Sequence, residues 1–466
     1  MEIKKIINRR ELLGIVLILL SAIKGFGQII SAEQNYAATS PGVVMVQTVF
    51  SATVSVNQVE MNEKRFRQLV DSVKRLDTSG TMLSAEEKLD MVVKALYNNP
   101  FRYFSGTNRY FRQQHKILST GTGFFITGDG YIVTNCHVID RDSAFIRRRF
   151  ILSTFQEVTE ANIRSLQTSW AMTLTDEQRN LLYNSYSFIY SQVSSMIIFD
   201  LKREIYVLYR ADSEENQPVK KKYPARIIIK GKPMPGKDVA ILKIDGLRDL
   251  PVLPVSTERI ARIGEPVLVF GYPEPVTSNT YLARETSIEP TLTSGIVSAV
   301  KRSIHGWPVF QMDAVITHGS SGSPVCNNEG RVIGLATFGS LEQNTGGLAT
   351  GFNFAIPFSV VKEFLDSVKI YPELSLATRK YNEGLNLYYG AYYRKARDKF
   401  EEVKKLNKDY PQLSYFIKQS NNHRLAGEDK ETFLQQFIYR ILAFTLVIGG
   451  VLLIAYRTWK RKKSRL

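Results

Sequence analysis

Three residues stand in surroundings that suit nucleophilic catalysis. His137 closes an apolar strand-like run, Asp238 precedes another, and Ser321 lies in a loop of small residues, Gly-Ser-Ser-Gly-Ser-Pro. A serine hydroxyl is a weak nucleophile until an imidazole takes its proton, and the imidazole needs a carboxylate to fix its tautomer and stabilise its cation. Histidine, aspartate, serine is one of the chain orders in which such triads occur. We interpret His137 as the base, Asp238 as the residue that orients it and Ser321 as the nucleophile.

The glycines around Ser321 suit a second requirement of acyl transfer, a site that binds the oxyanion. Glycine at 319 and 322 lets the backbone turn tightly enough to aim two N–H groups at one oxygen. We expect the N–H groups of Gly319 and Ser321 to form this oxyanion hole, where losing one donor costs about 10²–10³ in rate. Each signal alone has an ordinary explanation as a turn or a strand end. Together, at these separations, the three motifs are specific.

The elements that must position these residues are short and β-rich. Strand-like runs bounded by glycine and proline recur at 121–139, 225–230, 239–244, 267–270, 295–300, 309–315 and 332–336. This pattern predicts a mainly β fold, a barrel or sandwich. Apolar residues at helical spacing interrupt the pattern over 62–98 and 155–200. In those stretches Ser84 with Glu87, and Thr175 with Gln178, have the spacing of capping boxes.

Six segments in order resemble the HtrA (Deg) branch of trypsin-like serine endopeptidases, over about residues 40–370 without the helical insertions. They are GTGFFITGDGYIVTNCHVI (121–139), KDVAILKID (237–245), IGEPVLVFGYP (263–273), TLTSGIVSAVKRS (291–303), MDAVITHGSSGSPV (312–325) and GFNFAIP (351–357). The resemblance implies a trypsin-like double six-stranded β-barrel with the triad His137, Asp238 and Ser321 in the cleft between the barrels. It implies the amides of Gly319 and Ser321 as oxyanion donors, and no metal or nucleotide cofactor.

Specificity and assembly follow from the same resemblance. Ile316, five residues before the nucleophile, resembles the apolar pocket residue of this branch, and we place Ala336 and Phe338 in the same substrate pocket. We therefore expect cleavage after small or medium apolar residues. Two helical insertions, about 50–115 and 150–215, interrupt the protease domain, the first where this branch often carries a regulatory loop. The family also implies a homotrimer as one possible assembly.

After residue 357 the family usually continues into PDZ domains, whereas this chain continues into a helical pattern. Residues 376–430 place Gly384, Ala391, Tyr392, Ala396 and Phe400 roughly as in a tetratricopeptide (TPR) helix pair. One such unit cannot bury its own apolar face, so it must pack against something else. Two interpretations stay open, a helical hairpin that acts as a stalk and a repeat that binds a protein partner.

The net charge of +17, from 61 Lys and Arg against 44 Asp and Glu, is concentrated at the two ends. The first 27 residues carry +3 beside a short apolar run, which is typical of a signal peptide or signal anchor. The last ten residues carry +6 after an apolar run at 437–457, which predicts a transmembrane helix with a basic cytoplasmic tail at 458–466. We expect the catalytic domain outside the cytoplasm, in the periplasm if the cell is Gram-negative.

Only two cysteines, Cys136 and Cys326, are present, so a disulfide framework and a four-cysteine zinc site are excluded. Two buried thiols are the simpler interpretation, and a disulfide the alternative. The function predicted is hydrolysis of peptide bonds in extracytoplasmic proteins, unfolded or regulatory, through an acyl-enzyme. The alternative is a catalytically silent sensor or binding protein that keeps the protease fold. Nucleic-acid binding, the first interpretation of a positive charge, is weak because only +8 remains on residues 28–456.

Overall fold

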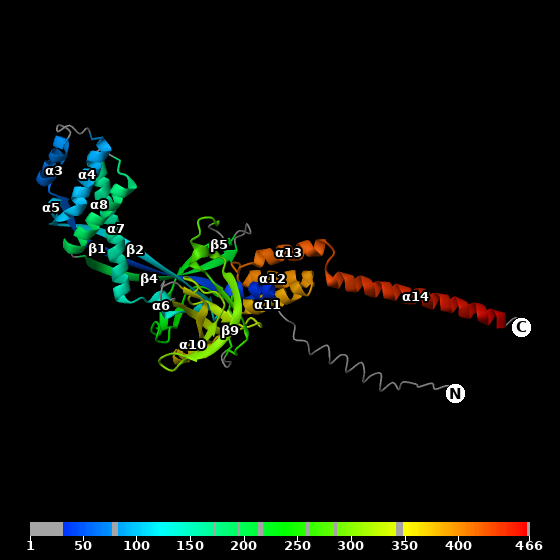
Figure 1. Cartoon of the computed structure of the whole chain (residues 1–466). Coiled ribbons are helices and arrows are strands. Elements are labelled where there is room, and N and C mark those ends of the chain that lie inside the picture. The colour runs from blue at the N-terminus through cyan, green and yellow to red at the C-terminus, as the bar shows by residue number, and fades with distance from the viewer. Residues whose placement is uncertain are drawn as a thin grey trace, which may run out of the picture.

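The computed structural model describes residues 31–76, 83–170, 173–193, 196–212, 218–256, 261–283, 287–341 and 348–463. The signal segment predicted at 1–27 lies outside these residues. The described chain forms a β-rich body with a helical lobe on one side and a group of C-terminal helices on the other, from which one long helix extends (Figure 1).

The first half of the body is a seven-stranded sheet in the order β5-β4-β1-β2-β3-β7-β6. Its strands are β1 (Val43–Met61), β2 (Phe104–Phe125), β3 (Tyr131–Thr134), β4 (Ile197–Asp212), β5 (Pro218–Pro224), β6 (Arg226–Lys230) and β7 (Ala240–Lys243). Alternate residues of β1 face opposite sides of the sheet, as the two-residue period of a strand requires. Val44 and Val46 enter one apolar core, whereas Val43 and Met45 enter another.

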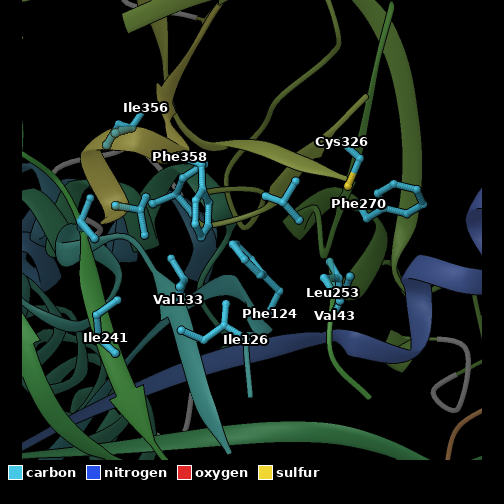
Figure 2. Close-up of a cluster of buried hydrophobic side chains, with 14 of the residues drawn as sticks. Val43, Phe124, Ile126, Val133, Ile241, Leu253, Phe270, Cys326, Ile356 and Phe358 are labelled. Atoms are coloured by element: carbon cyan, nitrogen blue, oxygen red, sulfur yellow. The ribbon is translucent and has the colours of Figure 1, made fainter. Parts of the chain in front are cut away.

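The second half of the body is a closed six-stranded barrel in the order β10-β13-β12-β11-β8-β9. Its strands are β8 (Pro266–Gly271), β9 (Thr291–Arg302), β10 (Pro308–Met312), β11 (Pro324–Cys326), β12 (Val332–Leu341) and β13 (Leu348–Pro357). Apolar side chains fill the space between the sheet and this barrel (Figure 2). The sheet contributes Val43, Phe124 and Ile241, and Phe270, Cys326 and Ile356 come from the barrel.

The prediction of two closed six-stranded barrels is therefore wrong for the first half of the body. The outer edge of β4 pairs with β5, from Asp212 with Pro218 to Tyr206 with Pro224. Among the described strands β5 pairs with β4 and β6 pairs with β7, so the strand order of the sheet has two ends. Only the second barrel is closed by a continuous ladder among the described strands.

The two insertions pack together as one helical lobe, although about forty residues of catalytic-domain sequence separate them. Its helices are α3 (Glu63–Leu76), α4 (Ala85–Asn98), α5 (Pro100–Tyr103), α7 (Ser143–Trp170) and α8 (Asp176–Val193). Leu96 of the first insertion shares a buried cluster with Ile163 and Ile189 of the second. Both capping boxes are confirmed by reciprocal hydrogen bonds at Ser84 with Glu87 and at Thr175 with Gln178.

The insertions are less helical than predicted, because strands carry the lobe away from the body. β1 and β2 stay paired from Val43 with Phe124 out to Met61 with Phe104, and β4 runs beside β1 as far as Ser55 with Ile197. We call the part of these strands that extends from the body the ribbon; it comprises residues 50–61 of β1, 104–117 of β2 and 197–203 of β4 (Figure 1). Residues 50–61, 104–115 and 197–212, which we expected within helical insertions, are therefore β structure.

The C-terminal helical unit contains three helices instead of the expected pair. After α10 (Phe358–Ser367) come α11 (Leu376–Tyr389), α12 (Tyr393–Leu406) and α13 (Leu413–Leu425). A Cβ on Gly384 would lie 2.6 Å from the Phe400 ring, so glycine permits the close approach of α11 and α12. The N-terminal helix α2 (Ala32–Thr39), followed by the short helix η1 (Ser40–Gly42), joins the same core through Ala37.

This helical unit is fixed to the body by polar contacts. The carboxylate of Asp212, at the end of β4, accepts the backbone N–H groups of Gln412 at 3.1 Å and Ser414 at 2.9 Å. Lys221 of β5 forms a 2.5 Å ion pair with Asp409. The unit therefore lies directly on the body. Likeness to a TPR stays a prediction.

The last helix, α14 (Lys430–Lys463), has 34 residues and extends away from the body (Figure 1). In the part of the chain that the structure describes, no helix is long and apolar enough to cross a membrane. The transmembrane helix predicted at 437–457 is therefore not confirmed. Side chains of α14 are described only as far as residue 450, so the end of that segment and the basic tail at 458–466 lie outside the described side chains.

Candidate active site

His137 and Asp238 meet because their strands are paired. Thr134 of β3 lies opposite Ala240 of β7, so the residues just after β3 and just before β7 are neighbours. His137 lies on the short helix α6 (Cys136–Ile139). Its backbone N–H donates to Asp238 Oδ1 at 2.8 Å, and its Nδ1 lies 2.5 Å from Asp238 Oδ2. Asp238 is fully buried, while the side chain of His137 is 20% exposed and faces the cleft.

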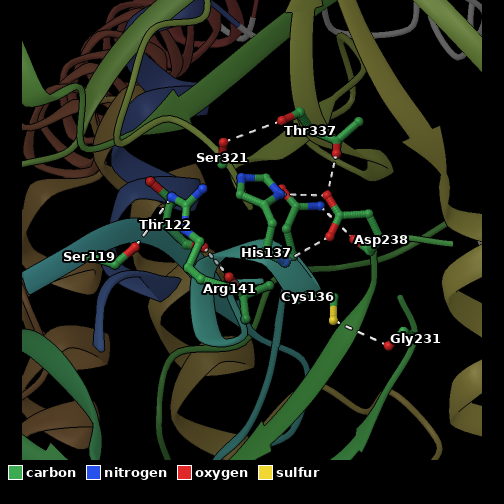
Figure 3. Close-up of polar contacts among 11 residues, drawn as sticks. Ser119, Thr122, Cys136, His137, Arg141, Gly231, Asp238, Ser321 and Thr337 are labelled. Carbon is green, nitrogen blue, oxygen red and sulfur yellow. Dashed lines mark hydrogen bonds and ion pairs between the residues drawn. The ribbon is translucent and has the colours of Figure 1, made fainter. Parts of the chain in front are cut away.

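A third group holds the carboxylate of Asp238, and no motif in the sequence predicted it. The hydroxyl of Thr337, on β12, donates to Asp238 Oδ2 at 2.8 Å (Figure 3). The side-chain amide of Asn135 donates to the backbone carbonyl of Asp238 at 2.7 Å. The Thr337 contact therefore orients the Asp238 side chain, and the Asn135 contact holds its backbone. The imidazole is thereby held with Nε2 as the free ring nitrogen.

The loop that carries Ser321 has the glycine conformations expected of it. Gly319 and Gly322 both have φ near +88°, in the left-handed region that favours glycine. A Cβ at 322 would lie 2.0 Å from the carbonyl oxygen of Thr122, and a Cβ at 319 would lie 2.3 Å from that of Tyr272. The backbone N–H of Thr122, on β2, donates to the Ser321 carbonyl at 2.7 Å, which ties the loop to the first sheet.

The peptide between His318 and Gly319 has its N–H directed away from the barrel wall. The carbonyl of His318 accepts the N–H of Glu274 at 2.6 Å, on the short helix α9 (Glu274–Thr277). The N–H of a trans peptide points opposite to its carbonyl, so the Gly319 N–H points away from Glu274. Within the described residues, neither this N–H nor that of Ser321 donates to another protein group. Both are available to an oxyanion.

Ser321 and His137, the predicted nucleophile and base, are not hydrogen-bonded to each other in this conformation. Ser321 Oγ donates instead to the backbone carbonyl of Thr337 at 3.3 Å (Figure 3). A contact this long is a weak hydrogen bond. Because serine rotates about a single bond between staggered rotamers, the hydroxyl needs only a rotamer change to leave Thr337. Ser321 and His137 line the same cleft.

The cleft between the sheet, the barrel and α7 has a volume of about 640 Å³. Ile316, predicted in the substrate pocket, is among its lining residues. Ala336 is not; it is fully buried in the core of the barrel, where its backbone N–H donates to Ser323 and its carbonyl accepts from Gly322. The backbone of Phe338 lies on β12, and its side chain lies outside the described residues.

Both cysteines are free thiols and fully buried, which confirms the simpler interpretation. Cys136 Sγ donates to the Gly231 carbonyl at 3.2 Å. Burial, followed by the charge of Asp238, raises the pKa of Cys136 to about 12. Burial also raises the pKa of Cys326 well above its usual value. Neither thiol is therefore a nucleophile near neutral pH.

Comparison with known proteins agrees with this geometry. Residues 199–335 match the family described as the trypsin-like peptidase domain. This range includes Asp238 and Ser321, and it begins after His137 and the helices of the second insertion. Over this range the chain is therefore similar to trypsin-like peptidase domains.

The curated relatives that are similar to the chain include serine endoproteases named DegS and DegP-like. The serine endoprotease DegS of Salmonella typhimurium is 34% identical over 135 residues, which cover 28% of this chain and 35% of the relative. A probable periplasmic serine endoprotease, DegP-like, of Pseudomonas savastanoi is 33% identical over 266 residues, or 56% of this chain and 37% of the relative. The chain thus spans a little over a third of the length of these relatives.

Among solved structures, the HtrA-type protease AlgW with decapeptide is similar at a TM-score of 0.37. The two chains are 17% identical, over 74% of this chain and 69% of that one.

Proposed function

We propose that this chain is a serine endopeptidase in which His137, Asp238 and Ser321 act as the triad. The observation that carries the proposal is the pair of His137 and Asp238. A fully buried carboxylate accepts one backbone N–H, one imidazole nitrogen and one hydroxyl, beside a loop that offers a serine and two free N–H groups. That arrangement suits acyl transfer better than it suits a structural role, because a buried charge is costly.

The steps follow from the positions of these groups. Ser321 Oγ turns from Thr337 to His137, gives its proton to Nε2 and attacks the carbonyl carbon of the scissile bond. Asp238 stabilises the imidazolium that forms, and the N–H groups of Gly319 and Ser321 bind the oxyanion. His137 then protonates the leaving amine, which leaves an acyl-enzyme on Ser321. A water molecule that loses its proton to His137 hydrolyses this ester and restores the serine.

The substrates proposed are polypeptides outside the cytoplasm, unfolded or regulatory. Ile316, which lines the cleft, favours a small or medium apolar residue before the scissile bond. The location is supported by the +3 segment at the N-terminus and by relatives whose names describe periplasmic proteases. A homotrimer, as implied by the family, is part of the proposal and is tested by the mass of the purified chain in solution.

Attachment of the 437–457 segment to a membrane also belongs to this proposal. Large apolar side chains of α14 are exposed, among them Phe437, Tyr439, Phe444 and Leu446. Exposed apolar surface of this extent usually marks a contact with another molecule or with lipid. Recovery of the chain in the membrane fraction after an alkaline wash, lost when residues 437–466 are removed, is the expected result. Recovery in the soluble fraction would contradict the attachment.

A fluorophosphonate probe tests the catalytic proposal. The expected result is covalent labelling of the full-length chain, which is abolished by Ser321→Ala and strongly reduced by His137→Ala. Ser320→Ala is the matched control, since this neighbouring serine lies in the same loop and has no assigned role in the chemistry. An unlabelled wild-type chain with an ordinary cooperative unfolding transition would contradict the proposal.

A catalytically silent protease fold is the second candidate, and one observation favours it. Ser321 Oγ contacts the Thr337 carbonyl instead of the imidazole. In an active enzyme the Ser321 hydroxyl rotates between the Thr337 carbonyl and His137, and it reacts with the probe. In a silent binding protein it stays on Thr337, and labelling is absent even at high probe concentration.

A further inference from the structure

One wall of the catalytic cleft comes from the second insertion and not from the sheet or barrel. Four lining residues come from α7 and the link before it, and we call Arg141, Phe145 and Arg149 the α7 wall; the fourth, Ile146, is buried. Arg141 lies in the link between α6 and α7, four residues after His137, and the other two lie on the first turns of α7. Leu118 and Ser119 of β2 face the same space. The wall places positive charge and apolar surface beside the catalytic histidine.

Arg141 has few partners for a partly buried cation. Its guanidinium donates to Ser119 Oγ at 3.3 Å and lies over the ring of Phe145, with 5.5 Å between the guanidinium carbon and the ring centroid (Figure 3). Its Nε is buried and has no hydrogen-bond partner among the described residues. No described carboxylate lies within ion-pair distance of it. A guanidinium has five N–H donors, so most of its capacity is unused.

Two acids near Arg141 are already engaged, and a third, the exposed Asp142, does not line the cleft. The adjacent Asp140 forms ion pairs with Arg203 and Lys230. Asp238, the carboxylate that acts on Arg141 through its charge, is saturated by His137 and Thr337. Removal from water lowers the pKa of Arg141, and the charge of Asp238 opposes this effect. The guanidinium stays charged and incompletely solvated, a state that an anionic group in the cleft would stabilise.

The remaining charged groups of the cleft do not change this balance. Arg149 is exposed and adds a second positive charge to the α7 wall. Glu274 is exposed on the opposite, barrel side of the cleft, where its backbone N–H binds the carbonyl of His318. His318 is also exposed there. The side of the cleft nearest α7 is therefore cationic.

The α7 wall lies on the leaving-group side of the cleft. The loop with Gly319 and Ser321 belongs to the barrel, as does Ile316. These groups would hold the substrate residue before the scissile bond. The amine that departs takes its proton from His137, so the chain that follows the scissile bond lies on the His137 side. The α7 wall is on that side as well. Ser119 lies on β2 of the first sheet, and Arg141 and Phe145 come shortly after α6, the helix that carries His137. The wall thus faces the residues just after the cut.

We propose that Arg141 binds a substrate carboxylate one to three residues beyond the scissile bond, while Leu118 and Phe145 contact an apolar neighbour of it. The inference rests on the proposed function, because it requires a polypeptide in this cleft. The carboxylate has two sources, an Asp or Glu side chain and the free C-terminus of the peptide. Leu118 and Phe145 are 60% and 46% exposed, so they have apolar surface to bury on such a substrate.

Peptide binding to the full-length Ser321→Ala chain tests this without turnover. Labelled peptides with valine before the bond carry either Glu or Gln at the second position after it, and a C-terminal amide. Fluorescence anisotropy gives the Kd of each. The Glu peptide is expected to bind about tenfold tighter, which is the range of one charge-assisted hydrogen bond. A second pair of peptides has Gln at the second position after the bond and ends at the third position, in either a free carboxylate or an amide. Tighter binding of the peptide with the free carboxylate identifies the C-terminus as a source of the carboxylate.

Matched variants in the same background assign the effect to Arg141. Arg141→Gln is expected to reduce the preference to near one, and Arg141→Lys to keep part of it. Arg147→Gln is the control, since Arg147 lies on the exposed face of α7 and does not line the cleft. Equal binding of the acid and amide peptides in both pairs overturns the inference. A preference that survives Arg141→Gln in a variant with an unchanged melting temperature overturns it too.

The two proposals fail in different ways. A wild-type chain that cleaves both peptides at equal kcat/KM supports the peptidase and removes the role of Arg141. A chain that resists the fluorophosphonate but prefers the acidic peptide through Arg141 supports the binding site and removes the hydrolysis.

Discussion

Thr337 Oγ1 donates to the same oxygen of Asp238 that faces the imidazole of His137, at 2.8 Å from one side while Nδ1 lies at 2.5 Å from the other. Thr337 comes from the closed barrel and Asp238 from the open sheet. The two halves of the body therefore contact each other through the carboxylate of Asp238. The relative position of sheet and barrel determines the orientation of the base.

Replacing Thr337 by valine removes this hydroxyl at nearly constant volume. We expect Thr337→Val to lower kcat about tenfold with little change in KM, because a hydrogen bond to a charged group is worth about 1.5–3 kcal/mol. Steady-state kinetics on a fluorogenic peptide measure the split. Thr337→Ser keeps the hydroxyl and is expected to retain most of the activity. A valine variant with full kcat would show that Asp238 needs no support from the barrel.

The backbone N–H of Glu274 is the target of the second prediction. It holds the His318 carbonyl, and Pro273 before it has φ −62° and ψ 131°, which a following proline tolerates. Glu274→Pro removes the N–H, frees the carbonyl to turn toward the cleft, and is expected to lower kcat about 10²–10³-fold. Glu274→Ala keeps the N–H and serves as the control. Equal activity of the two variants would contradict a role for this backbone contact.

The two buried thiols give a prediction about pH. With a pKa of about 12, Cys136 is a thiolate at a level of about 10⁻⁴ at pH 8, so alkylation of the folded chain by iodoacetamide is slow. Since its pKa is raised on folding, the neutral thiol contributes stability that is present below about pH 9 and is lost as the pH rises toward 12. Mass spectrometry after a timed exposure measures the labelling. Rapid alkylation of both thiols under native conditions, at the rate seen in guanidinium, would show that they are exposed.

The helical lobe should unfold as one unit, since the two insertions share a core. Leu96 and Ile189 are fully buried in the same cluster, and truncating either to alanine is expected to cost about 2–5 kcal/mol. Hydrogen exchange should show loss of protection in α4 and α8 together for each variant. Tyr97→Ala, at an exposed neighbouring position, is the control with a small effect. Exchange that rises only in the insertion carrying the substitution would show that the two insertions are independent.

The residues around His137, Asp238 and Ser321 could be predicted because each lies in a short motif that is complete by itself. Gly319 and Gly322 signal a tight turn, and apolar runs mark the strands that position the other two. Thr337, Glu274 and Arg141 were not predicted. Each acts on a residue far away in the sequence, and its role depends on strand pairing that a local pattern does not contain.

The ribbon was missed for a different reason. Residues 105–116 of β2 are mostly exposed on both faces, so they lack the alternation of apolar and polar residues that identifies a strand. The open sheet was missed because the family resemblance implies a closed barrel, whereas only the second barrel is closed among the described strands. The helices of the lobe were predicted from their apolar faces. The packing of the two insertions against each other was not predicted, because an apolar face does not specify which other face it contacts.

Strand β2 begins in the core of the lobe, at Phe104, and reaches the nucleophile loop at Thr122. That distance is about 60 Å at 3.3 Å per residue, and no linker interrupts it. One continuous strand thus connects the lobe to the loop of Ser321. A molecule bound to the lobe would therefore contact the same strand that donates a hydrogen bond to the Ser321 carbonyl.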